Sequence, residues 1–262
     1  MLIVVISRTE PYLNGAILIK EMCLSLKLEC KIVYIEDISF NYEAFSSSNS
    51  YTFYFLSNVA SIPRYADDFE RSFAGSVINK GFFISEMNKF TIQTCLRDVG
   101  VNVPKSIELS EQNFGSSLQG LKLPVYLKSQ KQADIVIRAS TMEEFNQCMI
   151  KQSTSNFYIE ESVDLDKFHL EKIYYINKYI ESKNLGFVVG VALNKILRNI
   201  SNALKLEVYS ADIFVSNAED DYVCIDINPS SGFFNSAKAR RGLIEYVLER
   251  LAKNKKSTSS ID

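Results

Sequence analysis

Short, almost continuous apolar runs alternate with amphipathic segments in the first third of the chain, and this pattern restricts the fold more than any other feature. The runs Leu2–Ser7, Lys31–Glu36 and Tyr51–Leu56 each have the length of one strand. Residues 16–27, between the first two runs, have the apolar spacing of a helix. Parallel strands that are buried on both faces consist of such apolar stretches. The sequence therefore predicts a small doubly wound α/β lobe that ends near Asn79.

The remaining two thirds predict a mixture of helices and strands. Helices are predicted over residues 85–99, 141–151, 186–204 and 236–253. Strands are predicted over residues 106–109, 124–129, 134–139, 157–162, 171–180, 207–216 and 221–228. The polar stretch 217–220 indicates that the last two strands form an antiparallel pair, and the Lys/Ser-rich tail 255–262 is predicted to be disordered.

The composition argues against several classes of protein. The 262 residues include 29 Lys and Arg against 31 Asp and Glu, without the basic excess that nucleic-acid binding requires. No stretch approaches the roughly 20 apolar residues that span a bilayer, and the apolar start lacks the features of a signal peptide. The five cysteines are scattered, which argues against a disulfide framework or a structural zinc site and favours a cytoplasmic location.

The single histidine, His169, limits the chemistry further. A metal site rich in histidine cannot be built from one residue, and the surroundings of His169 are those of an ordinary strand edge. Any catalysis is therefore expected to rest on Lys, Arg, Asp, Glu and Asn side chains.

Polar residues interrupt the last two predicted strands in a regular pattern. Alternation along residues 221–228 predicts that Cys224, Asp226 and Asn228 share one face of the sheet. Asp212 lies among apolar neighbours on the preceding strand, and antiparallel pairing would bring it opposite that face. Carboxylate and amide oxygens are the ligands that Mg²⁺ prefers. The alternative interpretation is a polar sheet face that contacts only solvent.

Two lysines are candidates for phosphate contacts. Lys128 lies inside the predicted strand 124–129, where an ammonium group needs an anion nearby unless it reaches solvent at the edge of the sheet. Lys89 lies near the start of a predicted helix, where contact with phosphate and contact with solvent are both compatible with the sequence.

A basic cluster stands near the start of the last predicted helix. Its members, Lys238, Arg240 and Arg241, oppose the helix dipole, so the stability of the helix does not explain their position. The cluster indicates either recognition of an anionic substrate or a solvated face that pairs with Glu245 and Glu249.

The order of these residues resembles that of the ATP-grasp superfamily, in particular its glutathione-synthetase-like branch of glutamate ligases and inositol polyphosphate kinases. The matching segments are Asn79, Asn88–Lys89, Gly100–Ser106, Pro124–Lys128, Phe157–Val163, Lys172–Tyr174, Asp212 and Asp226–Phe233. The resemblance covers about residues 76–250. It implies an ATP-grasp fold with a small lobe at 81–155 and a large lobe at 156–254, after an N-terminal α/β lobe at 1–80.

The resemblance also implies roles for individual residues, with ATP and Mg²⁺ as cofactors. The implied nucleotide-binding residues are Lys89, Lys128, Glu160, Glu161, Ser162, Val163 and Lys172. The implied Mg²⁺ ligands are Asp212, Asp226 and Asn228. The implied substrate contacts are Ser231, Gly232, Lys238, Arg240 and Arg241. Lys128 and Arg198 are the candidate catalytic residues.

The sequence departs from the family pattern in three places, one of which is Asp226, where the family more often has glutamate. No glycine lies between Lys128 and Ile137, where the family often has a Gly-rich flap, and the span from Lys172 to Asp212 lacks the usual Arg-rich strands. The leading prediction is a ligase that joins a carboxylate to an amine through an acylphosphate. The alternatives are a small-molecule kinase and a non-catalytic protein that binds nucleotide or a partner. A small molecule or peptide is the expected substrate, and a homodimer is compatible with the sequence.

Overall fold

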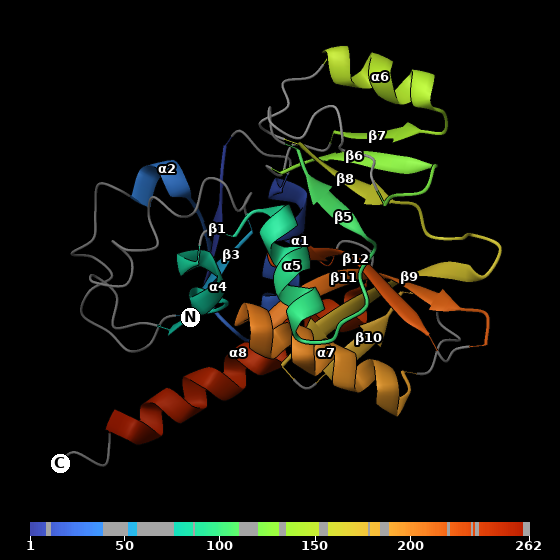
Figure 1. The fold of residues 1–262 in the computed structure, drawn as a ribbon. Helices are drawn as coiled ribbons and strands as arrows, with labels where there is room; N and C mark the ends of the chain where they lie inside the picture. The colour runs from blue at the N-terminus through green and yellow to red at the C-terminus, as the bar shows by residue number, and fades with distance from the viewer. Residues whose placement is uncertain are drawn as a thin grey trace.

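The computed structural model of the chain contains, among the residues that it describes, three four-stranded sheets with helices packed against them (Figure 1). The described residues are 1–8, 12–38, 52–56, 76–85, 87–109, 120–130, 135–151, 157–177, 179–183, 189–218, 221–231, 233 and 236–258. No helix in these ranges is long and apolar enough to cross a membrane.

The first sheet is parallel, with strand order β2-β1-β3-β4. Its strands are β1 (Leu2–Ile6), β2 (Cys30–Tyr34), β3 (Thr52–Phe55) and β4 (Ser76–Val77), and its helices are α1 (Leu13–Ser25), α2 (Ile35–Ile38) and α4 (Lys80–Ile84). Every side chain of β1 is buried, because α1 packs on one face of the sheet and α4 on the other. The α/β class predicted for the N-terminal lobe is confirmed.

The second sheet is antiparallel, with strand order β5-β8-β6-β7. It consists of β5 (Ser106–Glu108), β6 (Val125–Ser129), β7 (Val136–Ala139) and β8 (Phe157–Glu161), and α6 (Met142–Lys151) covers it. Phe145 and Met149 of α6 pack on Val125, Leu127 and Ile159, which form a small core separate from the rest of the molecule.

The third sheet is also antiparallel, with strand order β10-β9-β11-β12. Its strands are β9 (Phe168–Ile176), β10 (Tyr179–Ser182), β11 (Val208–Ser216) and β12 (Tyr222–Asn228), and its helices are α5 (Lys89–Asp98), α7 (Val191–Leu204) and α8 (Ala237–Thr258). Helices α5 and α7 pack on one face, and α8 packs on the other. Helix α5 thus belongs to the core of the large sheet, although it was assigned to the small lobe from the sequence.

Several predicted bounds differ from the structure, and two of these differences have a local cause. The predicted strand 171–180 is divided by Asn177, whose φ of 55° turns the chain from β9 back into the antiparallel strand β10. Asparagine adopts this left-handed conformation at low cost, so it can end a strand. Helix α8 continues to Thr258, into the tail predicted to be disordered, because lysine is a good helix former. Residues 259–262 lie outside the described residues.

Candidate functional site

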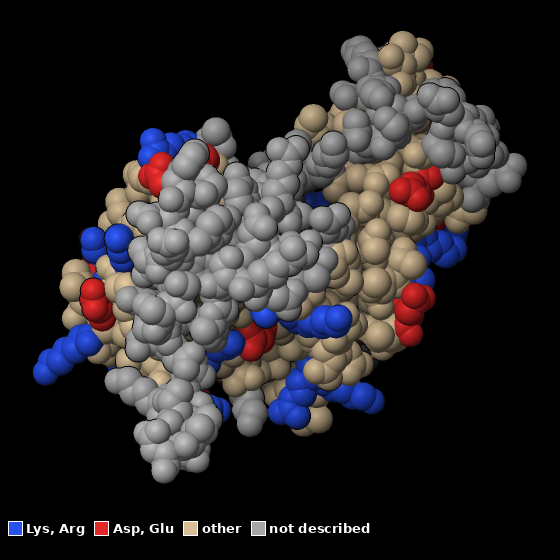
Figure 2. Space-filling model, turned by 90° about the vertical axis from the view of Figure 1, so that its left-hand side faces the viewer, with Lys and Arg blue, Asp and Glu red and all other residues tan. Residues whose placement is uncertain are grey.

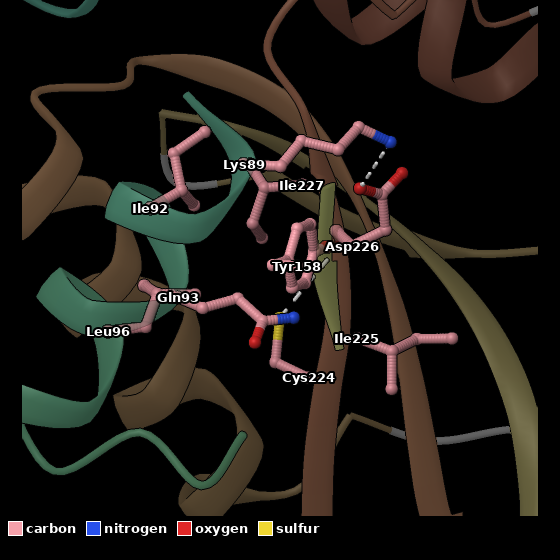
Figure 3. A pocket seen from close by; sticks show the side chains of 9 residues that line it. All are labelled: Lys89, Ile92, Gln93, Leu96, Tyr158, Cys224, Ile225, Asp226 and Ile227. Atoms are coloured by element: carbon pink, nitrogen blue, oxygen red, sulfur yellow. Dashed lines mark hydrogen bonds and ion pairs between the residues drawn. The ribbon is translucent and has the colours of Figure 1, made fainter. Parts of the chain in front are cut away.

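A β-bulge determines which way the polar residues of β12 point. Asp212 pairs with Asp226, but Ile213 pairs with Cys224, so Ile225 is the extra residue of the bulge. The bulge therefore shifts the alternation of side chains between Cys224 and Asp226. The prediction that these two residues share one face of the sheet is wrong. Cys224 is 2% exposed in the core below α5, and Figure 3 shows it directed toward that helix while Ile225 is directed away.

The opposite face of the large sheet carries a row of charged side chains. Asp212 in β11 lies directly between Lys172 of β9 and Asp226 of β12. The Lys172 Nζ is 2.8 Å from Asp212 Oδ1. Two carboxylates on directly paired residues repel one another, so this position of the sheet requires cations.

The next row on the same face contains Tyr174, Ser210 and Asn228. The Asn228 Oδ1 accepts a hydrogen bond of 2.9 Å from the Ser230 N–H and so fixes the turn after β12. The Ser210 side chain is 1% exposed, and its Oγ has no hydrogen-bond partner among the described residues. The pKa of Tyr174 is raised by burial and by the Asp212 carboxylate. An unsatisfied hydroxyl thus lies beside the two aspartates.

Helix α5 delivers a lysine to this row from the side. The Asn88 side chain caps the helix by accepting a hydrogen bond of 2.7 Å from the Thr91 N–H, and its amide donates to Gln130 at the end of β6. These contacts fix the start of α5 between the two antiparallel sheets. The next residue, Lys89, places its Nζ 3.3 Å from Asp226 Oδ1 (Figure 3).

The small sheet contributes a buried charged pair. Lys128 of β6 and Glu160 of β8 form an ion pair, and the second oxygen of Glu160 accepts a hydrogen bond from Gln93 of α5. Glu160 is only 2% exposed. Burial raises the pKa of Glu160, and the negative charge of Asp226 adds to this effect, whereas Lys128 and Gln93 oppose it. Glu160 and Asp226 are therefore close enough to influence each other.

A pocket lies where α5, β8 and β12 meet (Figure 3). Its lining residues are Lys89, Ile92, Gln93, Leu96, Tyr158, Cys224, Ile225, Asp226 and Ile227. The free space inside is about 10 Å³, enough for about one water molecule. Burial raises the pKa of Tyr158, and the carboxylates of Glu160 and Asp226 raise it further. A larger ligand can occupy this region only if the two sheets separate.

The charges of the site balance among the described residues. Each of three lysines is paired with one carboxylate, in the pairs Lys89–Asp226, Lys128–Glu160 and Lys172–Asp212. Within the described ranges, no three His, Cys, Asp or Glu side chains gather closely enough to hold a metal ion by themselves. These ion pairs can give way to bound ligands. A divalent cation can replace the lysines beside the aspartates, and an anion can replace the carboxylates beside the lysines.

Beyond the row of charges, the same face of the large sheet is apolar. Leu170, Phe214 and Val223 are paired across β9, β11 and β12, two residues away from Lys172 and Asp212 along their strands. Leu170 is 49% exposed, so this surface is open at one side. It offers a flat contact for a planar apolar or aromatic group beside the charged row.

The segment that follows β8 connects the small sheet to the large one. The Ser162 N–H donates to the Pro124 carbonyl at 3.1 Å, and the Glu161 carboxylate accepts from the Lys122 N–H at 2.8 Å. These bonds hold Glu161 and Ser162 against the small sheet. The Val163 N–H forms no hydrogen bond with the described part of the chain.

The structure does not bring Arg198 to this site. Arg198 lies on the exposed side of α7, whose buried residues Leu193, Leu197 and Ile200 pack on the face of the sheet opposite Asp212. The helical period of the sequence alone places Arg198 outward, but it does not show which face of the sheet the helix covers.

The predicted substrate residues after β12 have structural partners. The Arg241 Nε is 2.8 Å from Glu245 Oε1 on the exposed surface of α8, and the Lys238 Nζ is 3.8 Å from Glu181 Oε1. The exposed pairing of Arg241 with Glu245 agrees with the solvated-face alternative.

The turn before α8 is also fixed internally. Arg240 donates a hydrogen bond of 2.6 Å to the Phe233 carbonyl. Ser231 is buried, and its carbonyl accepts a hydrogen bond of 2.5 Å from the Tyr54 hydroxyl of the N-terminal lobe. Gly232 lies outside the described residues. Ser231 and Arg240 thus hold the turn in place.

Three residues of the site were not predicted from the sequence, namely Gln93, Tyr158 and Ser210. Gln93 carried a usable signal, because it is a polar residue between Ile92 and Leu96 on the side of α5 that faces the core. Tyr158 and Ser210 lie within apolar strands, and their contact with the site depends on how the two sheets meet.

No family model matches the sequence. No curated protein matches it either. Solved structures do match. A RimK-domain ATP-grasp protein from Sphaerobacter thermophilus has a TM-score of 0.70 at 12% identity, covering 95% of this chain and 100% of that chain. D-alanine–D-alanine ligase from Bacillus anthracis, complexed with ATP, has a TM-score of 0.71 at 15% identity, covering 98% and 99%. The ATP-grasp ligase PsnB, complexed with a precursor peptide and AMPPNP, has a TM-score of 0.65 at 12% identity, covering 95% and 97%.

Proposed function

Because the chain has the ATP-grasp fold, we propose that it is an ATP- and Mg²⁺-dependent ligase that joins a carboxylate to an amine through an acylphosphate. The observation that carries this proposal is the set of three lysine–carboxylate pairs between the two antiparallel sheets. ATP has four negative charges, and with two Mg²⁺ ions it is neutral. Binding of such a ligand would therefore leave the net charge of the site unchanged when the lysines turn to phosphate and Mg²⁺ binds the aspartates.

The residues present fit Mg²⁺. Asp212 and Asp226 supply hard anionic oxygens from adjacent strands, and Asn228 supplies an amide oxygen two residues beyond Asp226. The remaining coordination positions of Mg²⁺ are commonly filled by water and phosphate. A bound Mg²⁺ would neutralise charge on the phosphates, and it would relieve the repulsion between the paired aspartates.

The rest of the site fits a nucleotide. Lys89 and Lys128 extend toward the same region from α5 and β6, and they would contact phosphate once released from their carboxylates. The apolar surface at Leu170 and Phe214 would support the adenine ring. The Val163 N–H would donate to an adenine nitrogen, because it forms no hydrogen bond with the described residues.

The chemistry expected of this chain is positioning and charge neutralisation. Lys89 and Lys128 would hold the phosphates so that the γ-phosphorus faces the substrate carboxylate in line with the leaving ADP oxygen. The carboxylate oxygen attacks phosphorus, the bond to ADP breaks, and an acylphosphate results. An amine then attacks the acyl carbon and releases phosphate. Separation of the sheets admits the ligands, and their return excludes water from the acylphosphate.

The test is ADP release with candidate amino acids and peptides, with the products identified by mass spectrometry. An amide product together with ADP and phosphate supports the ligase. A phosphorylated product without an amide would instead establish the kinase alternative. Asp226→Asn is expected to reduce ADP release about 100-fold or more, whereas Glu143→Gln on the exposed surface of α6 leaves it unchanged.

Thermal melting with ATP and Mg²⁺ separates a chain that binds nucleotide from one that binds only a partner, and ADP release then separates the enzymes from a non-catalytic nucleotide-binding protein. A bound nucleotide raises the melting temperature in proportion to RT ln(1 + [L]/Kd). The wild type is expected to show a rise that requires both ATP and Mg²⁺. Absence of any rise, together with absence of ADP release, would support the partner-binding alternative.

A further inference from the structure

A second pocket lies away from the site described above, between the N-terminal lobe and the ends of α7 and α8. Its volume is about 550 Å³, which is in the range of about 300–1,000 Å³ that is common for small-molecule sites. The polar residues that line it include Lys80, Asn202, Lys205, Glu207 and Arg250. Glu207 precedes β11, so the pocket is about 16 Å along that strand from Asp212.

Positive charge predominates in the described lining of this pocket. Lys205 and Arg250 are cationic, and among the described lining residues Glu207 supplies the one carboxylate. Figure 2 shows the side of the molecule that carries the N-terminal lobe, where Lys and Arg side chains gather near the lower part of the face. Because Glu207 pairs with Arg250 and Lys205 forms no ion pair within the described chain, the described lining keeps an uncompensated positive charge and favours an anionic ligand.

The one carboxylate of the lining is fully engaged. The Glu207 Oε1 accepts hydrogen bonds from Arg250 Nη1 at 2.5 Å and from the Tyr246 hydroxyl at 3.0 Å. Its Oε2 accepts a hydrogen bond of 3.1 Å from the Asn79 N–H. Glu207 and the Tyr246 hydroxyl, which accepts from Nη1 at 2.9 Å, thus fix the Arg250 guanidinium at the wall of the pocket, and its Nη2 and Nε groups form no hydrogen bond with the described residues.

The second cation, Lys205, is held by the backbone. It ends α7 in the left-handed conformation, with φ of 53°, and it forms no ion pair within the described chain. Its aliphatic stem packs on Gly81, where an added Cβ would lie 2.8 Å from the Lys205 Cβ. The close contact with Gly81 restricts the rotamers of Lys205, so its ammonium is directed by packing.

We propose that this pocket binds a phosphorylated small molecule, with Lys205 and Arg250 contacting the phosphate. A phosphate monoester carries between one and two negative charges at neutral pH, so it can pair with Lys205 and with the Nη2 and Nε groups of Arg250. Arginine and lysine are the usual partners of phosphate oxygens. Asn202 at the pocket edge can donate a hydrogen bond to the remainder of the ligand. The site is separate from the proposed nucleotide site and does not depend on it.

The test is calorimetric titration of inorganic pyrophosphate into the full chain in Mg²⁺-free buffer. Lys205→Asn removes the ammonium charge, and asparagine tolerates the left-handed conformation of this position. The variant is expected to bind pyrophosphate about tenfold or more weakly. Lys195→Asn, on the exposed surface of the same helix, controls for the loss of one charge and is expected to change the affinity less than about twofold.

Lys89→Met distinguishes this pocket from the proposed nucleotide site. Pyrophosphate binding that survives Lys89→Met and weakens with Lys205→Asn supports the proposal, whether or not the chain releases ADP from ATP. Absence of binding to the wild type, equal weakening by Lys195→Asn, or loss with Lys89→Met alone would overturn it. Circular dichroism and melting temperature confirm that each variant is folded.

Discussion

At the scale of single residues, the buried Asn79 joins the N-terminal lobe to the large sheet through four side-chain hydrogen bonds. Its side-chain amide donates to the carbonyls of Val208 and Pro229 at 2.5 and 2.8 Å. Its Oδ1 accepts from the N–H groups of Glu207 and Val208 at 2.8 and 2.9 Å. Asn79 thereby ties the start of β11 to the turn after β12, and both segments carry residues of the candidate site.

We expect Asn79→Ala to lower the free energy of unfolding by about 3 kcal/mol, because it removes four buried hydrogen bonds and places alanine at a φ of 62°. Urea denaturation measures the loss. Asn177→Ala is the matched control, since Asn177 has a φ of 55° but its side chain forms no hydrogen bond with the described residues. Asn177→Ala should lower the free energy of unfolding by only about 1 kcal/mol. Equal losses would show that the Asn79 hydrogen bonds contribute nothing.

Glu160 gives a prediction about pH. The pKa of Glu160 is raised above its ordinary value of 4.5, mainly by burial. The folded protein therefore keeps this proton to a higher pH than the unfolded chain does. The free energy of unfolding falls as the pH rises from about 4.5 through the raised pKa, and it is constant above that.

Glu160→Gln lacks this titration. Its free energy of unfolding, measured by urea denaturation, is expected to be lower than that of the wild type by a larger amount near pH 4 than near pH 7. A difference that grows with increasing pH would show that the ion pair with Lys128 outweighs the burial of the carboxylate.

At the scale of elements, two neighbouring residues of α7 test whether the helix contributes to stability or to catalysis. Leu197 is fully buried, whereas its neighbour Arg198 is exposed on the side away from the sheet. Leu197→Ala should lower the free energy of unfolding by about 2–5 kcal/mol, because it leaves a cavity in the core. Arg198→Ala should change neither stability, beyond about 0.5 kcal/mol, nor ADP release. A large loss of turnover in Arg198→Ala would restore it as a catalytic residue.

The sequence predicts the elements better than their faces. The apolar runs identify β1 and β3, and the period of α7 identifies its buried side, because burial leaves a regular trace in the sequence. The bulge at Ile225 leaves no such trace, so alternation misassigns Cys224. The pairing of Lys89 with Asp226 joins residues far apart in the chain, and it depends on how α5 packs between the sheets.

At the scale of the whole molecule, the packing divides the chain into two unequal parts. One core joins β1 and β3 of the N-terminal sheet to Ile173 of β9 and Ala211 of β11, and a second core joins the same sheets through α8. The small sheet and α6 have a separate core. Side-chain pairs such as Asn88–Gln130 and Glu160–Gln93 are among the links between the small sheet and α5.

This division predicts unequal local stability. Amides of Leu127 in β6 are expected to exchange with solvent hydrogen through an opening of lower free energy than amides of Val4 in β1 or Ile213 in β11, because the small sheet can open without disturbing the larger cores. Native-state hydrogen exchange measures all three. Val4 and Ile213 should share one free energy of opening, because their sheets pack on common cores and unfold together.

Bound ATP and Mg²⁺ should stabilise the small sheet as well as the larger cores against opening. A nucleotide held by Lys128 on the small sheet and by Asp226 on the large one must be released before the small sheet opens, so its binding free energy adds to that of the opening. The protection of Leu127 is therefore expected to rise by as much as that of Val4, because the global unfolding through which Val4 exchanges also releases the ligand. Protection that rises at Val4 and not at Leu127 would mean that the nucleotide does not bridge the sheets. In that case Lys89, Lys128 and the aspartates would have to act without the closure that excludes water from an acylphosphate.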